Sequence, residues 1–144
     1  MQGVDYAYTI HGWIKGVNSD TMSSDNDIGK DGKATNIHQY IGKDAFGYSL
    51  GYYHNTGGTS DYNDIGGLSA ANRFDANVSG SDLLADRTDL WNGHISYMIT
   101  SIPVLTGIST GASPYQVLPT ARGSSYKYDQ LNRLLATKSY LNLN

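Results

Sequence analysis

The segment whose residue types could hold an ion runs from Asp25 to Gly32. It reads Asp-Asn-Asp-Ile-Gly-Lys-Asp-Gly, which places aspartates at positions 25, 27 and 31. Carboxylate oxygens spaced along a short loop are the ligands that a hard cation such as Ca²⁺ requires. The chemistry to consider first is therefore cation binding.

This segment departs from the EF-hand calcium loop at the positions that define that loop. Counted from Asp25, position five is Gly29, where the loop has an acid or Asn, and position six is Lys30, where it has glycine. The loop also ends in a glutamate ligand, and this chain contains no glutamate. We therefore expect a solvated turn loop that holds no metal.

Close pairs of carboxylates could supply the acid and the base or nucleophile of glycoside hydrolysis. The local candidates are Asp61 with Asp64 and Asp86 with Asp89. All 13 acidic residues are aspartates, so such pairs arise by chance, and aspartate commonly forms turns. An Asp-based hydrolase stays open as a third reading, but we favour turn formers.

Histidines and nucleophile motifs give no stronger lead to catalysis. The four histidines are scattered and never occur at the spacing of metal ligands: His11, His38, His54 and His94. The chain has no nucleophile elbow, phosphate loop or zinc helix motif. We expect no enzyme, no cofactor, and no catalytic, cofactor-binding or metal-ligating residue.

Aromatic residues at alternate positions could form a stacking surface for sugars, because Tyr and Trp combine apolar faces with a polar edge. In sheets such rows more often form core and cross-strand pairs. We expect core for five of these residues: Tyr6, Tyr8, Phe46, Tyr48 and Tyr52. A carbohydrate-binding β-module with exposed Tyr and Trp remains the alternative.

Composition favours an all-β chain rich in turns. The acidic residues are all aspartate, which prefers caps and turns, and 17 glycines mark further turns. The net charge of −3 gives no indication of the basic surface that proteins use to bind nucleic acid. Cysteine is absent, and no apolar run in the sequence is long enough for a transmembrane helix. The 144 residues suffice for about one domain, and residues 1–5 do not read as a signal peptide.

Hydrophobic alternation predicts three strand regions before the last part of the chain. The first is residues 4–10, resuming at 13–17 after Gly12, and the second is residues 46–52, where Gly47, Ser49 and Gly51 face away from the aromatics. Small residues on one face predict close approach by another layer or backbone. The third follows Asn92-Gly93, a strong hairpin signal, with Ile95, Tyr97 and Ile99 on one face.

Polar or proline-containing stretches separate these strands. We predict loops at 18–36 and 54–64, helical turns at 68–74 and 81–86, and a connecting excursion over 103–123 with one short strand at 115–118.

Residues 124–139 predict a hairpin around which the rest of the chain is organised. Tyr126 and Tyr128 share one face of a strand. Asp129 can open a turn through its side chain, and Asn132 tolerates positive φ, so the pair predicts a tight connection. Arg133 then leads into a basic and aliphatic second arm.

At these residues the chain resembles the YD-repeat family, also called RHS repeats, whose unit is Tyr-x-Tyr-Asp-x-x-Gly-Arg-Leu. Residues 126–134 follow that unit with Asn132 in place of glycine, and residues 6–14 follow it with Thr9 for Asp and Trp13 for Arg. Longer blocks at 5–18, 43–53 and 90–96 are similar to segments of Bacteroidetes-type RHS proteins. The repeat residues that carry the resemblance are Tyr6, Tyr8, Gly12, Trp13, Asn92, Gly93, Tyr126, Tyr128, Asp129, Asn132 and Arg133.

The resemblance implies an antiparallel hairpin meander that forms part of a β-shell. It further implies one segment, residues 1–144, of a much larger secreted or cell-surface protein, a structural role, and neighbouring repeats as partners. Some shells of this family enclose a C-terminal toxin. The family's self-cleavage motif centres on Asp-Pro, which this chain lacks, so no protease residues are carried over. We expect no contact with nucleic acid and no membrane insertion.

Overall fold

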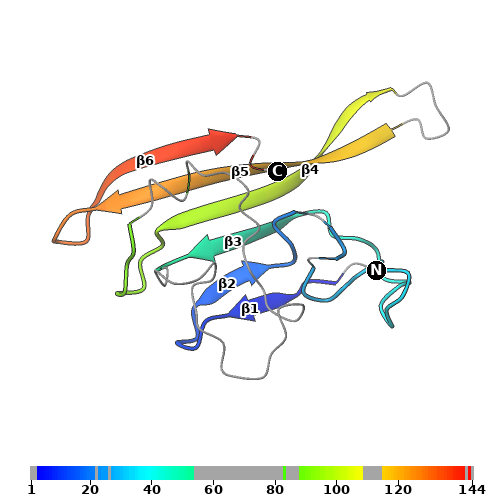
Figure 1. Ribbon diagram of the computed structural model, residues 1–144, viewed down its shortest axis with the longest axis horizontal. Helices are drawn as coiled ribbons and strands as arrows, with labels where there is room; N and C mark the ends of the chain where they lie inside the picture. Colours follow the sequence, from blue (N-terminus) through cyan, green and yellow to red (C-terminus); the bar gives the residue numbers. More distant parts are fainter. Residues whose placement is uncertain are drawn as a thin grey trace.

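Six strands form one antiparallel sheet in which every strand pairs with the next along the chain. The computed structural model describes residues 3–21, 23–25, 27–53, 83, 88–108, 115–141 and 143. The strands are β1 (Tyr6–Tyr8), β2 (Ile14–Val17), β3 (Gly47–Gly51), β4 (Tyr97–Ile108), β5 (Tyr115–Tyr128) and β6 (Leu134–Leu141). Figure 1 shows them side by side in chain order, with β1 and β6 at the two edges. The prediction of an all-β hairpin meander is confirmed.

The predicted excursion over residues 103–123 is wrong, because most of it is strand. β4 and β5 pair from Tyr97 opposite Ser125 through to Ile108 opposite Tyr115, and Pro103 lies opposite Pro119. The pairing of β3 with β4 stops at Ser101, and that of β5 with β6 stops at Arg122. Beyond these points the pair is a two-stranded ribbon that projects from the sheet (Figure 1). Proline is tolerated there because the outer side of each strand needs no ladder donor.

The core lies on one face of the sheet and is built from β4 and β5. Tyr97 and Ile99 of β4 and Ala121 of β5 pack with Leu83 and Leu143, all of them buried. Tyr97 and Ile99 share the buried face, as predicted, while Ile102 is exposed. A Cβ on Gly123 would lie 2.5 Å from Leu143 Cδ1, so a larger residue at this position would have to displace the Leu143 side chain.

The small residues of β3 lie against the loop that follows β2, which confirms the predicted close approach. A Cβ on Gly47 would overlap the backbone oxygen of Ser19. Ser49 Oγ donates to Asp20 Oδ2 at 2.9 Å, and Ser101 Oγ donates to the Asp20 carbonyl. The first three residues of the loop predicted over 18–36 are therefore buried: Asn18, Ser19 and Asp20.

On the opposite face of the N-terminal strands, Val17 is buried where it pairs with Tyr6 and Tyr48, but several aromatic residues are exposed. Tyr6 and Tyr8 are 51% and 58% exposed, and Phe46 is 42% exposed. The core prediction is therefore wrong for these three residues. The core prediction is confirmed for Tyr52, which is buried and whose hydroxyl donates a hydrogen bond to Ile14 O at 2.7 Å. Tyr48 is half-buried.

Several sequence predictions lie outside the described residues. They are the loop at 54–64, the helical turns at 68–74 and 81–86 apart from Leu83, His54, and the aspartates Asp61, Asp64 and Asp86. In the described part of the chain, no helix has the length and apolarity needed to cross a membrane.

Candidate functional site

The two predicted repeats form hairpin turns with the same hydrogen bonds. In the second, Asn132 N donates to Asp129 O at 3.0 Å, and Asp129 N donates to Arg133 O at 3.0 Å. In the first, Gly12 N donates to Thr9 O at 2.9 Å, and Thr9 N donates to Trp13 O at 2.7 Å. The side chain that opens each turn also accepts a hydrogen bond from the backbone. Thr9 Oγ1 accepts from Trp13 N at 3.0 Å, and Asp129 Oδ1 accepts from Arg133 N at 2.9 Å.

Strand pairing around these turns also repeats. Tyr6 faces Val17 and Tyr8 faces Ile14 in β1–β2, with a bulge between Ala7 and Tyr8. The same two pairings recur 120 positions later in β5–β6, where Tyr126 faces Thr137 and Tyr128 faces Leu134. A bulge again lies between the two pairs, here between Lys127 and Tyr128. Gly12 has φ 82° and Asn132 has φ 62°, so both turns close through a left-handed residue. The two segments are thus the same structural unit.

The turn at residues 91–93 lies beside the second of these hairpins. Gly93 has φ 83°, and Asn92 Nδ2 donates to Asn132 Oδ1 at 2.9 Å. The residues before the turn, 88–90, are not strand, so the predicted hairpin is a turn leading into β4. Asn92 and Asn132 therefore belong to adjacent turns at one end of the sheet.

A cluster of carboxylates lies at the N-terminal edge of the sheet. Asp5 precedes β1, while Asp27 and Asp31 belong to the loop between β2 and β3, and one oxygen of each lies within 4.8 Å of the others. Asp27 and Asp31 are each only 3% exposed. The expectation of a solvated loop is therefore wrong for these two residues.

A fourth carboxylate, that of Asp44, adjoins the cluster. Burial, followed by the hydrogen bond with Asp27 and repulsion from the other carboxylates, raises the pKa of Asp44 to about 7. Burial and the nearby Asp31 and Asp27 also raise the pKa of Asp5, which His38 partly opposes. Asp27 and Asp31 thus lie close enough to Asp5 and Asp44 to disfavour the charged form of those two residues.

Asn18 joins the segments that carry Asp5 and Asp44. Its Oδ1 accepts from Asp5 N at 2.8 Å, and its own N–H donates to Asp5 O at 2.9 Å. Its Nδ2 donates to Phe46 O at 2.9 Å, close in the chain to Asp44. Asn18 is fully buried and has φ 54°, a backbone conformation that Asn tolerates better than most residues.

The lysines of the loop contact Asp25, which is outside the cluster. Lys33 Nζ lies 2.9 Å from Asp25 Oδ1, and Lys30 Nζ donates to the Asp25 carbonyl. The hydrogen bond and charge of Lys33 lower the pKa of Asp25. His38 Nδ1 lies 2.8 Å from Gly29 O and 3.7 Å from Asp31 Oδ1. The loop therefore places its lysines on the exposed carboxylate and not on the buried ones.

No family model matches this chain, and the searches of curated proteins and of solved structures gave no match. The likeness to YD repeats accordingly rests on the residues quoted above.

The other described histidines pack against aromatic rings. His11 stacks on Trp13 with 5.0 Å between ring centroids, and His94 meets Tyr128 edge-on at 5.0 Å. Tyr128 in turn donates its hydroxyl to Ile95 O at 3.2 Å, and burial raises its pKa. These contacts give the two histidines a packing role.

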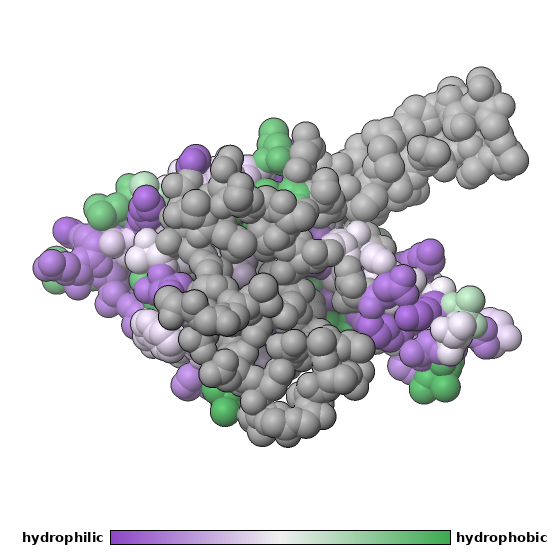
Figure 2. Space-filling view, viewed as in Figure 1, coloured by the Kyte–Doolittle hydropathy of each residue, from purple (hydrophilic) through white to green (hydrophobic). Residues whose placement is uncertain are grey.

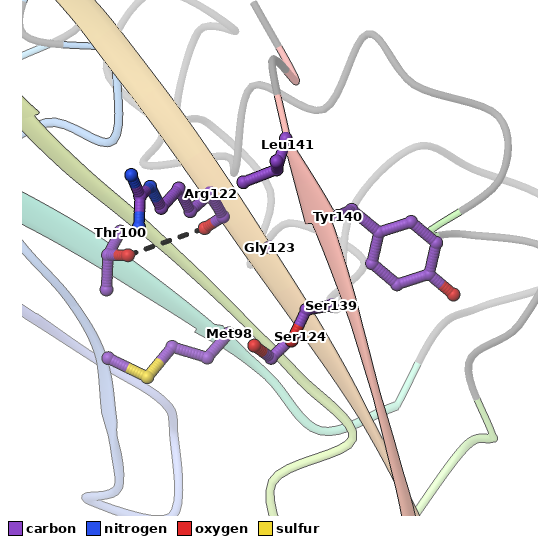
Figure 3. Close-up of a pocket in the computed structure, with 8 residues that line it drawn as sticks. All are labelled: Met98, Thr100, Arg122, Gly123, Ser124, Ser139, Tyr140 and Leu141. Atoms are coloured by element: carbon purple, nitrogen blue, oxygen red, sulfur yellow. Dashed lines mark hydrogen bonds between the residues drawn. The ribbon is translucent and has the colours of Figure 1, made fainter.

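A shallow hollow of about 240 Å³ lies across β4, β5 and β6. Figure 3 shows Met98, Thr100 and Arg122 on one side of it, whereas the Tyr140 ring points away from them. Thr100 Oγ1 donates to Arg122 O at 3.4 Å. Among the described residues that line it, Arg122 is the single charged side chain, so the hollow has no acid–base pair.

Sequence reasoning considered Asp27 and Asp31 but did not connect them with Asp5 or Asp44. The four residues come from three segments, and Asn18 joins the two that carry Asp5 and Asp44. A loop motif in the sequence indicates only ligands within the loop, so it could not predict contacts with Asp5 or Asp44.

Proposed function

We propose that this chain is a structural β-hairpin segment of a large secreted or cell-surface protein of the YD-repeat type. It forms part of the wall of a β-shell, of the kind that can enclose a C-terminal toxin. Its partners are neighbouring repeats of the same parent chain, and it performs no catalytic step.

The edge strand β6 is the observation that carries this proposal. Seven of its eight residues are exposed, including Leu134, Leu135 and Leu141 on both faces of the strand. An edge strand offers unpaired backbone groups, and exposed apolar residues on it favour a further strand. The repeated hairpin geometry at β1–β2 and β5–β6 supports the same reading, because a repeated unit can continue in both directions.

The test is the association state of the 144-residue chain. Sedimentation velocity over a hundredfold concentration range should show association, because the edge can pair with a second copy. Leu135→Lys should reduce association by placing a charge on the edge strand. Leu131→Lys is the matched control, since Leu131 is similarly exposed but lies in the turn before β6. A chain that stays monomeric at every concentration and melts sharply and reversibly would contradict the proposal.

A carbohydrate-binding β-module is the second candidate, favoured by the exposure of Tyr6 and Tyr8. Their rings are 6.2 Å apart and inclined by 22°, on an open part of the sheet. Trp91, 69% exposed, stacks on Tyr53 with centroids 4.0 Å apart. On the face shown in Figure 2, the described apolar residues form separate small spots among polar ones.

This second candidate predicts that a glycan array gives hits which Tyr6→Ala or Tyr8→Ala removes. Lys127→Ala, at an exposed strand position with no ring, is the control. An array without hits on folded protein would leave the shell segment as the better account.

A further inference from the structure

We propose that the carboxylates of Asp5, Asp27 and Asp31 bind one calcium ion, which fastens the loop between β2 and β3 to the start of β1. This site is separate from the edge-strand surface, so its test does not depend on the proposed shell function.

The distances between the carboxylates suit a single Ca²⁺. One oxygen from each lies within 4.8 Å of the other two. Ca²⁺ bonds oxygen at 2.3–2.6 Å, so two of its ligands are at most about 5 Å apart. Mg²⁺ demands a stricter octahedral geometry at about 2.0–2.1 Å and keeps more of its water. The three carboxylates are therefore close enough to share one Ca²⁺.

Buried oxygens without partners give an independent sign that a ligand is missing. Asp27 Oδ1 and Asp31 Oδ2 are inaccessible to solvent and accept no hydrogen bond from any residue that the structure describes. The other Asp27 oxygen accepts from Asp31 N at 2.9 Å, which holds the two residues in position. A buried carboxylate oxygen without a partner costs on the order of 1–3 kcal/mol or more. A cation would satisfy both oxygens at once.

Two glycines leave the space beside these oxygens open. A Cβ on Gly3 would overlap Asp31 Oδ2 and lie 3.5 Å from Asp5 Oδ2. A Cβ on Gly29 would overlap Asp5 Oδ2 and lie 2.7 Å from Asp5 Cγ. The unpartnered oxygen of Asp31 and the carboxylate of Asp5 therefore border the same position. Any residue other than glycine at position 3 or 29 would displace an oxygen that we assign to the metal.

The donor set favours calcium over softer metals. The three groups offer only carboxylate oxygen, and the chain has no cysteine. The nearest described imidazole, that of His38, contacts Gly29 O and lies outside the group of three. Hard cations prefer oxygen, whereas zinc and copper favour nitrogen and sulfur. Water and nearby carbonyls would complete the coordination.

The direct test is calorimetric titration of CaCl₂ into the 144-residue chain after treatment with EGTA at pH 7.5. We expect one ion per chain, with a Kd on the order of 10⁻⁴–10⁻³ M, as in other calcium modules of modest affinity. At 10 mM CaCl₂ the Tm should rise by about 3–8 °C, because Ca²⁺ binds the folded state. The same concentration of MgCl₂ should produce a smaller shift.

Isosteric variants identify the ligands. Asp27→Asn and Asp31→Asn should each weaken Ca²⁺ binding at least about tenfold, the loss that follows even from disturbing outer groups of a metal site. In EGTA, both variants should melt no lower than the unmodified chain, because each removes one buried charge from a group of carboxylates that repel one another. Asp25→Asn is the matched control: it is in the same loop, is exposed, pairs with Lys33, and should bind Ca²⁺ normally.

Four results would overturn the proposal. They are the absence of heat and of a Tm shift at 10 mM CaCl₂, unchanged affinity in both Asn variants, an equal loss of affinity in Asp25→Asn, and an equal shift with MgCl₂. Where a variant or the chain itself is unfolded in EGTA, circular dichroism during CaCl₂ titration gives the readout. Folding driven by Ca²⁺ supports the site, and a chain that stays unfolded up to 10 mM counts against it.

Discussion

Asn92 Nδ2 donates a hydrogen bond to Asn132 Oδ1 across 2.9 Å, which joins the turn before β4 to the turn between β5 and β6. Asn132 also has φ 62°, in the left-handed region. Glycine could adopt that φ but could not accept this bond. The single departure of residues 126–134 from the YD-repeat unit thus coincides with a contact that only the side chain provides.

This double role of Asn132 predicts an order of stability among variants. Asn132→Gly keeps the backbone conformation and loses the bond to Asn92, so its cost should be small at this exposed site. Asn132→Ala loses both and should lower the free energy of unfolding by a further 1–2 kcal/mol or so, the approximate cost of a left-handed L residue. Urea unfolding of the three proteins measures the order. An alanine variant as stable as the glycine variant would contradict the assigned backbone role.

The carboxylate of Asp129 should make the second hairpin sensitive to acid. Hydrogen bonds from Arg133 N and Leu131 N, at 2.9 and 2.8 Å, and the ion pair to Arg133 lower its pKa below 3.8. A lowered folded-state pKa contributes stability above 3.8 that is lost as the pH falls through the folded value. Asp129→Asn should therefore melt lower than the unmodified chain at pH 7, and the difference should shrink below pH 3.8. If the difference in Tm between Asp129→Asn and the unmodified chain did not depend on pH, the charge of Asp129 would not be its cause.

The close approach of Gly47 to Ser19 predicts a steric cost. In Gly47→Ala the new methyl would overlap backbone, which cannot rotate away as a side chain could. We expect a loss of about 1–3 kcal/mol in the free energy of unfolding, as for other overpacked sites. Lys127→Ala, at an exposed position in β5, should stay within about 0.5 kcal/mol of the unmodified chain. Chemical denaturation compares the two, and equal values would argue against the tight contact.

Removing a hydroxyl should distinguish buried from exposed tyrosines. Tyr52→Phe loses the bond to Ile14 O in a buried setting and should cost about 1 kcal/mol or more. Tyr8→Phe changes a ring that is 58% exposed and should be nearly neutral. Thermal melts of both variants give the comparison. A larger loss at Tyr8 would mean that the N-terminal aromatic face is covered in solution.

The calcium proposal predicts that Gly29→Ala weakens Ca²⁺ binding, because the methyl would displace the Asp5 carboxylate. Gly12→Ala is the matched control. Its Cβ would meet nothing within 4 Å, but its φ of 82° makes alanine costly. The control should therefore lose stability yet keep its calcium affinity, as measured by calorimetry. Normal Ca²⁺ affinity in Gly29→Ala would mean that Asp5 is not a ligand of the ion.

Local patterns were sufficient for the two repeat hairpins, for β3 and for the start of β4. Turn formation depends on a few adjacent residues, so Thr9 with Gly12 and Asp129 with Asn132 predicted both hairpins. Alternation likewise located β3 and the start of β4. Proline misled the prediction over 103–123, because a ribbon with open outer sides accepts residues that an inner strand excludes.

Burial and the carboxylate cluster, in contrast, were decided by contacts between distant segments. Alternation shows that a strand has two different faces, but which face is covered depends on where the loop after β2 lies. That loop covers the side of Gly47 and Ser49, whereas Tyr6 and Tyr8 are exposed. Asp5, Asp27 and Asp31 likewise meet only in the folded chain, because the start of β1 and the loop after β2 come together there, and their spacing in the chain carries no sign of contact.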